Sequence, residues 1–320
     1  MPHPIKILVA EPFDFSPVAV QILQRAGEVT LRHCDREHLR NAFREFDVVW
    51  FRLAHRIDPT FFNSALKCRL LVTPVTGLDH IDLEACIAHG VRVASLRGEV
   101  EFLKDIRATA ELTIGLTLAL LRKIPQAAAD VMAGNWNRDV FRGGELHGKT
   151  IGLVGVGRLG TIVARYFRAF DANVIGYDPR PDFPHEAANR VDSLDALLER
   201  ADIVSLHVNY HAGTRHLLSS PEFARMKLGA VLVNTSRGGV VDEDAMLAAL
   251  RTGRLGGAAL DVLDGEPEIS PTHPVIEYAR THENVLVVPH LGGNTRESFA
   301  QTEVFLAQKV VNYLAEDKHQ

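Results

Sequence analysis

The stretch KTIGLVGVGRLGTIVARYF at 149–167 decides the fold. It begins as an apolar, strand-like run and ends with apolar side chains at helical spacing. Between the two stand Gly155, Gly157 and Gly160, in the order Gly-x-Gly-x-x-Gly. In a strand-turn-helix unit the first glycine allows the tight turn, the second lets a pyrophosphate approach the backbone, and the third lets the helix pack closely. The stretch therefore predicts a dinucleotide-binding unit, with the N–H groups at the start of the helix facing the phosphates.

Asp178 supports this prediction. It ends the next strand-like run, NVIGYD at 173–178, at the distance where an acidic residue hydrogen-bonds a ribose 2′-hydroxyl. Its charge would repel a 2′-phosphate, which favours NAD over NADP, although Arg180 leaves room for NADP. The alternative role of Asp178 is that of a turn residue before Pro179.

Strand-like and helix-like segments alternate along the whole chain. A long helix pattern runs from 107 to 122, and further ones cover 158–170, 193–200, 221–227 and 242–251. The last pattern, from Thr295 onward, is expected to return to cover the first domain. The alternation predicts an α/β fold of two doubly wound parallel sheets joined by right-handed crossovers. The strand-like runs are 5–10, 28–32, 47–51, 69–74, 91–96, 150–155, 173–178, 202–208, 230–235, 257–262 and 285–289.

Length and composition limit the classes of function. A chain of 320 residues predicts two domains. The net charge of −5 and 23% charged residues are those of an ordinary soluble enzyme, so no nucleic-acid partner is expected. The three cysteines lack disulfide or zinc spacing, which favours the reduced cytoplasm. The apolar stretch at 112–121 is shorter than the roughly 20 residues of a membrane span, so we expect a buried helix and no membrane partner.

Three short motifs late in the chain each place a reactive side chain after a strand-like run. They are NTSRGG at 234–239, LDGEP at 263–267 and VPHLGG at 288–293, which carry Arg237, Glu266 and His290. The planar fork of Arg237 can hold the oxygens of a 2-oxo acid in two hydrogen bonds. His290 can give or take a proton near neutral pH, and Glu266 can fix its tautomer. With a dinucleotide, this set indicates hydride transfer.

Each of these residues also has a simpler explanation. Arg237 is compatible with a surface loop, Glu266 with a solvated turn before Pro267, and His290 with a backbone-bonded strand end. Taken singly these explanations are favoured, whereas the set at the strand ends of one domain favours an active site. The histidines His207, His211 and His216 allow a metal hypothesis, but no motif at ligand spacing accompanies them, so no metal is expected.

The motifs together resemble the D-isomer-specific 2-hydroxyacid dehydrogenase family, most closely its phosphoglycerate dehydrogenase-like branch. The similarity covers nearly the whole chain and rests on the glycine turn, YDP, VNTSRGGVVDEDAML, AALDVLDGEP and VPHLGGNT. It implies two Rossmann-like domains with a cleft between them: a substrate domain of residues 1–98 plus 292–320 and an NAD-binding domain of residues 99–291. It also implies a homodimer that interconverts a 2-oxo acid and an (R)-2-hydroxy acid.

The resemblance assigns a role to individual positions. Arg237 would bind the substrate, His290 would be the acid-base residue and Glu266 its carboxylate partner. Arg52, Leu53, Thr76 and Gly77 would contact the substrate. Trp136 would lie at the dimer contact. Cofactor contacts are implied for Gly155, Gly157, Arg158, Leu159, Gly160, Asp178, His207, Thr214, Thr235, Asp261 and Gly292.

Departures from the family pattern leave the substrate open. Leu53, Ala54 and His55 replace the small hydroxylated residues usual after the arginine. The hinge from Leu96 to Glu111 is longer than usual in the family and carries the cations Arg97, Lys104 and Arg107. Either these cations bind a phosphate or a second carboxylate of the substrate, or they only keep the hinge soluble. Serine feedback through an appended regulatory domain is not expected.

Two other functions compete with hydride transfer to a 2-oxo acid as explanations of these motifs. An NADH-sensing binding protein of the co-repressor type would use the same fold without turnover. A phosphite dehydrogenase would keep the same three reactive residues. A formate dehydrogenase would carry glutamine where Glu266 stands, so the glutamate argues against it.

Overall fold

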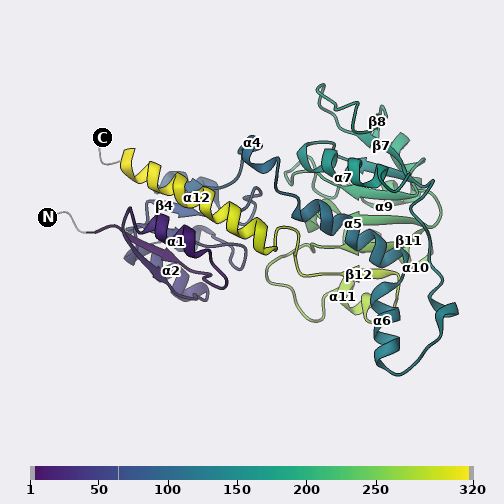
Figure 1. Cartoon of the computed structure of the whole chain (residues 1–320), viewed down its shortest axis with the longest axis horizontal. Helices are drawn as coiled ribbons and strands as arrows, with labels where there is room; N and C mark the ends of the chain where they lie inside the picture. The colour runs from purple at the N-terminus through teal and green to yellow at the C-terminus, as the bar shows by residue number, and fades with distance from the viewer. Residues whose placement is uncertain (1–3, 64, 317–320) are drawn as a thin grey trace. The chain divides into compact units, whose positions relative to one another are not determined.

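The computed structural model describes residues 4–63 and 65–316. Positions 1–3, 64 and 317–320, which the predicted substrate domain includes, lie outside the described residues. The chain divides into two compact units: the first runs to Ile106 and resumes at Asn294, and the second is Arg107–Gly293. Each unit holds a parallel sheet (Figure 1), and the predicted fold class is confirmed.

The first unit is built on a five-stranded sheet in the order β2-β1-β3-β4-β5. All its pairings are parallel, as expected for strands joined by helical crossovers. The predicted strand-like runs are confirmed here as β1 (Lys6–Val9), β2 (Glu28–Leu31), β3 (Val48–Trp50), β4 (Leu70–Val72) and β5 (Arg92–Ala94).

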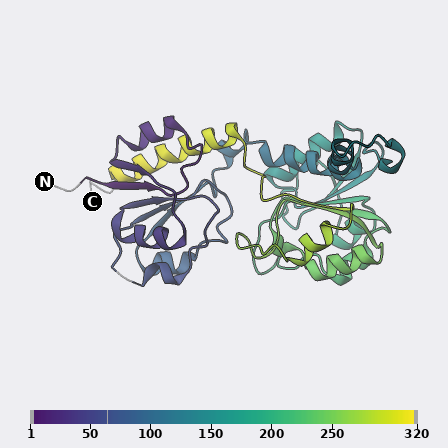
Figure 2. The same ribbon diagram turned by 90° about the horizontal axis from the view of Figure 1, so that it is seen from below.

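Helices cover both faces of this sheet, because successive strand residues point to opposite sides and both sets are apolar. Ile7 and Val9 face α1 (Pro17–Leu23) and α12 (Arg296–Glu316), whereas Leu8 faces the layer of α2 (Arg36–Glu45). The short elements η1 (Pro59–Phe62) and α3 (Leu83–Ala88) lie between these strands in the chain. Figure 2 shows α12, in yellow, beside α1 on one face. The expected return of the last helix to the first domain is confirmed.

The segment after β5 packs on α12. It forms α4 (Val100–Leu103), whose Phe102 ring stacks on Phe305 with centroids 4.0 Å apart. Lys309 Nζ lies 2.5 Å from Glu99 Oε1. These contacts keep the chain in the first unit as far as Ile106, beyond the expected break at residue 98.

The second unit is built on a seven-stranded parallel sheet in the order β12-β11-β10-β9-β6-β7-β8. Six strands match predicted runs, whereas β8 (Asn189–Arg190) was not predicted because two polar residues carry no strand pattern. The others are β6 (Thr150–Val154), β7 (Asn173–Tyr177), β9 (Ile203–Leu206), β10 (Ala230–Asn234), β11 (Leu255–Leu260) and β12 (Val285–Val287).

The two faces of this sheet are again buried by helices. Ile151 and Leu153 face α5 (Ala108–Leu121) and α7 (Arg158–Arg168), while Val154 faces the opposite helical layer. The predicted burial of the apolar stretch in α5 is confirmed. Within the described part of the chain, no helix is both long and apolar enough to cross a membrane. The remaining elements are α6 (Ile124–Met132), η2 (Arg138–Phe141), α8 (Leu194–Leu198), α9 (Ser220–Arg225), η3 (Gly238–Val240), α10 (Glu243–Arg251) and α11 (Pro274–Ala279).

Candidate active site

The glycine turn lies between β6 and the first turn of α7, as the sequence predicts. Gly155 has a φ of +88°, and a Cβ there would lie 2.6 Å from the His207 carbonyl oxygen, so only glycine fits. Gly160 lies against Gly155, where a Cβ would come 2.3 Å from its carbonyl oxygen. Gly157 caps α7, and its α-carbon faces open space apart from the Arg180 guanidinium. The turn is therefore a backbone cradle at a helix N-terminus, which suits a pyrophosphate.

Cationic side chains stand at the same end of the unit. Arg158 and Leu159 open α7, directly after the cradle. Burial, together with the charge of Arg107, lowers the pKa of Arg158. Arg107 and Arg158 thus lie close enough to repel each other, and both favour an anion nearby.

Asp178 directly follows β7, close to the predicted strand end, and is buried. Its Oδ2 accepts a hydrogen bond from the Val156 amide at 3.0 Å, which ties the strand end to the glycine turn. Arg180 donates to the same carboxylate from Nε and Nη2, each at 3.0 Å. Although burial opposes the shift, these hydrogen bonds from Arg180 and Val156 lower the pKa of Asp178. Asp178 is an ionised acceptor that already holds a cation beside the expected ribose position.

Three further residues assigned to the cofactor follow β9 and β10. The ring of His207 contacts Ser205 Oγ at 2.9 Å, and burial lowers its pKa to about 4, so this histidine is neutral at pH 7. Thr214 Oγ1 donates to the Asn209 carbonyl at 2.7 Å and so closes a turn after β9. Thr235 is buried against Thr113 of α5, with the hydroxyl oxygens 2.9 Å apart.

Arg237 follows β10 and has an extended backbone. Its carbonyl accepts a hydrogen bond from Asn234 Nδ2 at 3.0 Å, and its Nη1 donates to the Ser236 carbonyl at 2.8 Å. The next residue, Gly238, packs directly on the turn that carries Glu266: a Cβ at Gly238 would lie 2.0 Å from the Leu263 carbonyl carbon. This contact links the arginine motif to the glutamate motif.

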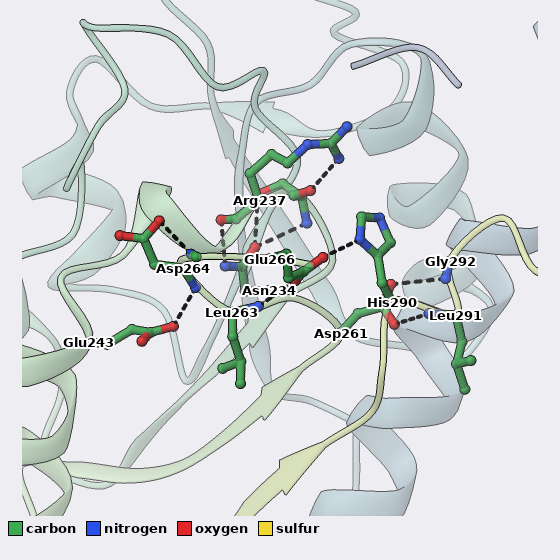
Figure 3. A network of polar contacts seen from close by, with 12 residues as sticks. Asn234, Arg237, Glu243, Asp261, Leu263, Asp264, Glu266, His290, Leu291 and Gly292 are labelled. Atoms are coloured by element: carbon green, nitrogen blue, oxygen red, sulfur yellow. Dashed lines mark hydrogen bonds and ion pairs between the residues drawn. The ribbon is translucent and has the colours of Figure 1, made fainter. Parts of the chain in front are cut away.

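Glu266 and His290 form a hydrogen-bonded pair. The carboxylate Oε2 of Glu266 lies 2.5 Å from Nδ1 of His290, and its Oε1 accepts from the Leu263 amide at 2.6 Å. Both side chains are about a quarter exposed. Figure 3 shows the imidazole turned toward the carboxylate, with Arg237 in the same network. Because Glu266 holds Nδ1, the expected acid-base role of His290 falls to Nε2.

The loop that carries His290 is anchored to the end of β11. His290 has a φ of +52°, an uncommon conformation for a non-glycine residue, and its amide donates to the Asp261 carbonyl at 2.8 Å. The Asp261 carboxylate accepts from the amides of Leu291 at 2.5 Å and Gly292 at 2.9 Å. Burial raises the pKa of Asp261. Asp261, assigned by resemblance to the cofactor, thus holds the histidine loop in place.

In the first unit, the residues assigned to the substrate follow neighbouring strands. Leu53 is half-buried after β3, and Thr76 is exposed beside the half-buried Gly77 after β4. Arg52 is engaged within this unit: Nη2 donates to Glu303 Oε1 at 2.6 Å, and Nη1 donates to the Phe13 carbonyl at 2.9 Å. The Arg52 side chain is only 12% exposed, and that of Glu303 is fully buried. One N–H of Arg52 therefore joins the end of β3 to α12 through Glu303, and a second binds the Phe13 carbonyl.

The cations of the long hinge are also placed by the structure. Lys104 Nζ donates to Glu101 at 2.6 Å on the short helix α4, and Arg97 is exposed. Arg107 begins the second unit, near Arg158. Lys104 is thus partnered on its own helix, and the charge of Arg107 acts on Arg158 at the start of α7.

Comparison with known proteins decides the family. Residues 114–292 match the profile described as D-isomer specific 2-hydroxyacid dehydrogenase, NAD binding domain. A hydroxypyruvate reductase of Thermotoga maritima is 31% identical over 309 residues, which cover 97% of this chain and 98% of that protein. The chain belongs to the D-isomer specific 2-hydroxyacid dehydrogenase family. The predicted family and its cofactor, NAD, are confirmed.

Further relatives place this family member in the phosphoglycerate dehydrogenase-like branch. The D-3-phosphoglycerate dehydrogenase of Methanocaldococcus jannaschii is 35% identical over 316 residues, covering 97% of this chain. The chain spans only 57% of the length of that relative. Among solved structures, the D-lactate dehydrogenase of Aquifex aeolicus, complexed with NAD and lactic acid, has a TM-score of 0.83 at 26% identity. That alignment covers 98% of this chain and 95% of the other.

Proposed function

We propose that this chain is an NAD-dependent D-2-hydroxyacid dehydrogenase, which transfers a hydride between NAD(H) and a 2-oxo or (R)-2-hydroxy acid. The observation that carries the proposal is the contact of 2.5 Å between Glu266 and Nδ1 of His290, in the unit that carries the NAD binding domain. A histidine held in this way through one nitrogen presents the other to a substrate oxygen.

NAD(H), when bound, supplies or accepts the hydride. The backbone cradle at Gly155 and Gly157 fits its pyrophosphate, and the ionised Asp178 fits its ribose hydroxyls. Hydrogen bonding of the ribose to Asp178 requires Arg180 to share or release the carboxylate oxygens that it now holds. Arg180 would then be placed to meet a 2′-phosphate, which keeps NADP open as a second cofactor.

Side chains of this protein would bind the substrate and transfer the proton. Arg237 would hold the carboxylate or carbonyl oxygens of the substrate and keep C2 oriented. In reduction, C2 gains the hydride, the carbonyl π electrons move to oxygen, and Nε2 of His290 gives that oxygen a proton. In oxidation the same nitrogen removes the hydroxyl proton. Glu266 fixes the tautomer and balances the charge of the imidazolium.

A panel of 2-oxo acids with and without a phosphate tests this function. We expect NADH oxidation with at least one of glyoxylate, hydroxypyruvate, 3-phosphohydroxypyruvate or a longer 2-oxo acid. Because Glu303 already balances Arg52, we expect no preference for the phosphorylated compound. Turnover of none of them would contradict the proposed activity. A clear preference for the phosphorylated acid would assign other cations, such as Arg107, to its phosphate.

We further propose that the active form is a homodimer that associates through α6 and η2. None of the residues of α6 is buried, although the helix carries several apolar side chains. Met132 is 82% exposed and Trp136 is 88% exposed, and Ile124, Val131 and Val140 are also exposed. Figure 1 shows α6 standing away from the body of its unit. An apolar surface of this kind suits self-association about a two-fold axis.

Replacing Trp136 with aspartate is expected to convert the dimer to a monomer, because it would place a charge in a desolvated contact. The molar mass from light scattering after size-exclusion chromatography would report the change. The matched control is Leu228→Asp, since Leu228 is 77% exposed in a turn elsewhere in the same unit. A wild-type monomer, or an equal effect of both variants, would remove this surface from the interface.

A further inference from the structure

A second carboxylate-histidine pair stands behind the first. Glu243, in the first turn of α10, has its Oε2 at 3.3 Å from Nε2 of His273, the residue that precedes α11. Both side chains are 16% exposed. Neither residue has a part in the hydride transfer proposed above.

The two pairs hold neighbouring peptide groups of one turn. The Leu263 amide donates to Glu266 Oε1 at 2.6 Å, and the next amide, that of Asp264, donates to Glu243 Oε1 at 2.9 Å. Figure 3 shows Glu243 reaching the turn from the side opposite His290. The turn that carries Glu266 is thus held from both sides by carboxylates.

His273 is oriented toward Glu243 by its own helix. Its Nδ1 accepts from the Val275 amide at 3.4 Å, as the N-cap of α11. With Nδ1 an acceptor, the ring proton of the neutral imidazole lies on Nε2, the atom that faces Glu243. The pair therefore joins α10, α11 and the turn, three elements that are separate in sequence.

We propose that Glu243, backed by His273, is a positioning residue that sets the turn 263–266 so that Glu266 meets Nδ1 of His290. This inference rests on the proposed function, because it deepens the role of Glu266. The Glu243 side chain is only 16% exposed, so it meets the turn largely out of contact with solvent, and this burial raises its pKa to about 7. A carboxyl oxygen shielded from water in this way is a strong acceptor for a backbone amide.

Steady-state kinetics of the full chain with the best 2-oxo acid of the panel test the proposal. We expect Glu243→Ala to lower kcat by about 10–100-fold, because a displacement of about 1 Å can cost that much, with KM changed less than about threefold. Glu243→Gln keeps an acceptor for the Asp264 amide and is expected to retain most of kcat. His273→Asn keeps a capping side chain but shortens its reach to Glu243, so we expect an intermediate loss.

The matched control is Asp202→Ala. Asp202 also accepts from a backbone amide, that of Thr150 at 2.7 Å, and pairs with a cation, Lys227, at 2.9 Å. It lies in the same unit but directly before β9, where it contacts the start of β6, away from the turn. Its loss is expected to lower the melting temperature without lowering kcat. Equal losses of kcat in both alanine variants would overturn the proposal, and so would a Gln variant as impaired as Glu243→Ala.

Hydrogen exchange of the segment 261–267, followed by mass spectrometry, gives a second measurement that does not depend on turnover. We expect faster exchange in Glu243→Ala than in the wild type, and wild-type exchange in Asp202→Ala. If the wild type reduces no 2-oxo acid, the proposed function fails, and the exchange result still decides whether Glu243 holds the turn. Unchanged exchange in Glu243→Ala would overturn the positioning role.

Discussion

The His290→Ala variant is expected to lose about 10²–10⁴-fold in kcat/KM, while its Kd for NADH stays within about twofold of the wild-type value. The loss follows from removing the group that exchanges a proton with the substrate oxygen. Binding of NADH should persist because the glycine cradle and Asp178 lie on other strands of the sheet. The rate at which NADH absorbance falls under steady-state conditions measures the first quantity, and fluorescence titration with NADH measures the second.

His216→Ala is the control for this variant. His216 is an exposed histidine that also has a left-handed backbone, with a φ of +49°. The kcat/KM of His216→Ala therefore shows how far the loss of a histidine from a left-handed backbone position lowers activity by itself. A His290→Ala enzyme that turns over within about tenfold of the wild type would exclude His290 as the acid-base residue.

Gly238→Ala is expected to be the most damaging small substitution near the site. The added Cβ would lie 2.0 Å from the Leu263 carbonyl carbon and 2.1 Å from the Asp264 nitrogen. Backbone atoms cannot yield as a side chain can, so the turn must move by about 1 Å or more. We expect kcat to fall by about 100-fold, because Glu266 moves away from His290. Overpacking should also lower the free energy of unfolding by about 1–3 kcal/mol.

Gly115→Ala separates these effects from a general cost of adding a methyl group. Gly115 is exposed on α5, and a Cβ there would meet nothing within 4 Å. We expect this variant to keep wild-type kcat. Its free energy of unfolding should rise by about 0.5–1 kcal/mol, because alanine is a better helix former than glycine. Chemical denaturation and kcat are measured for both variants. Wild-type kcat in Gly238→Ala would mean that the turn tolerates displacement.

Much of the fold could be predicted because parallel strands buried on both faces are continuous apolar runs. β6 and α7 are examples, since the run IGLV, the glycines and the helical spacing all agree. β8 was missed, since Asn189 and Arg190 are held by pairing with β7 rather than by any apolar pattern. The route of the segment 99–106 was also beyond sequence reasoning, because the stacking of Phe102 on Phe305 joins residues distant in the chain.

The members of the candidate site and the hydrogen bond between Glu266 and His290 were predicted from the sequence, whereas the contacts that hold these residues in place were not. Arg237, Glu266 and His290 follow β10, β11 and β12, which are neighbours in the sheet. Glu243 was missed, although it stands in the acidic run Asp242–Asp244 after the arginine motif. Such a run has the composition of a helix N-terminus, and nothing in it distinguishes the acid that turns inward.

The sequence by itself determined the parallel sheets, the glycine cradle and the strand ends that bear the reactive side chains. This was possible because buried strands require apolar residues and turns with positive φ require glycine, so each requirement is visible in the residue types themselves. Only the tertiary structure decided that Arg52 pairs with Glu303, although 251 positions separate them, and that Gly238 seats the turn of Glu266. Those contacts depend on how whole helices and turns dock. The sequence shows the same letter for a charged or small residue whether that residue contacts water, a substrate or another part of the chain.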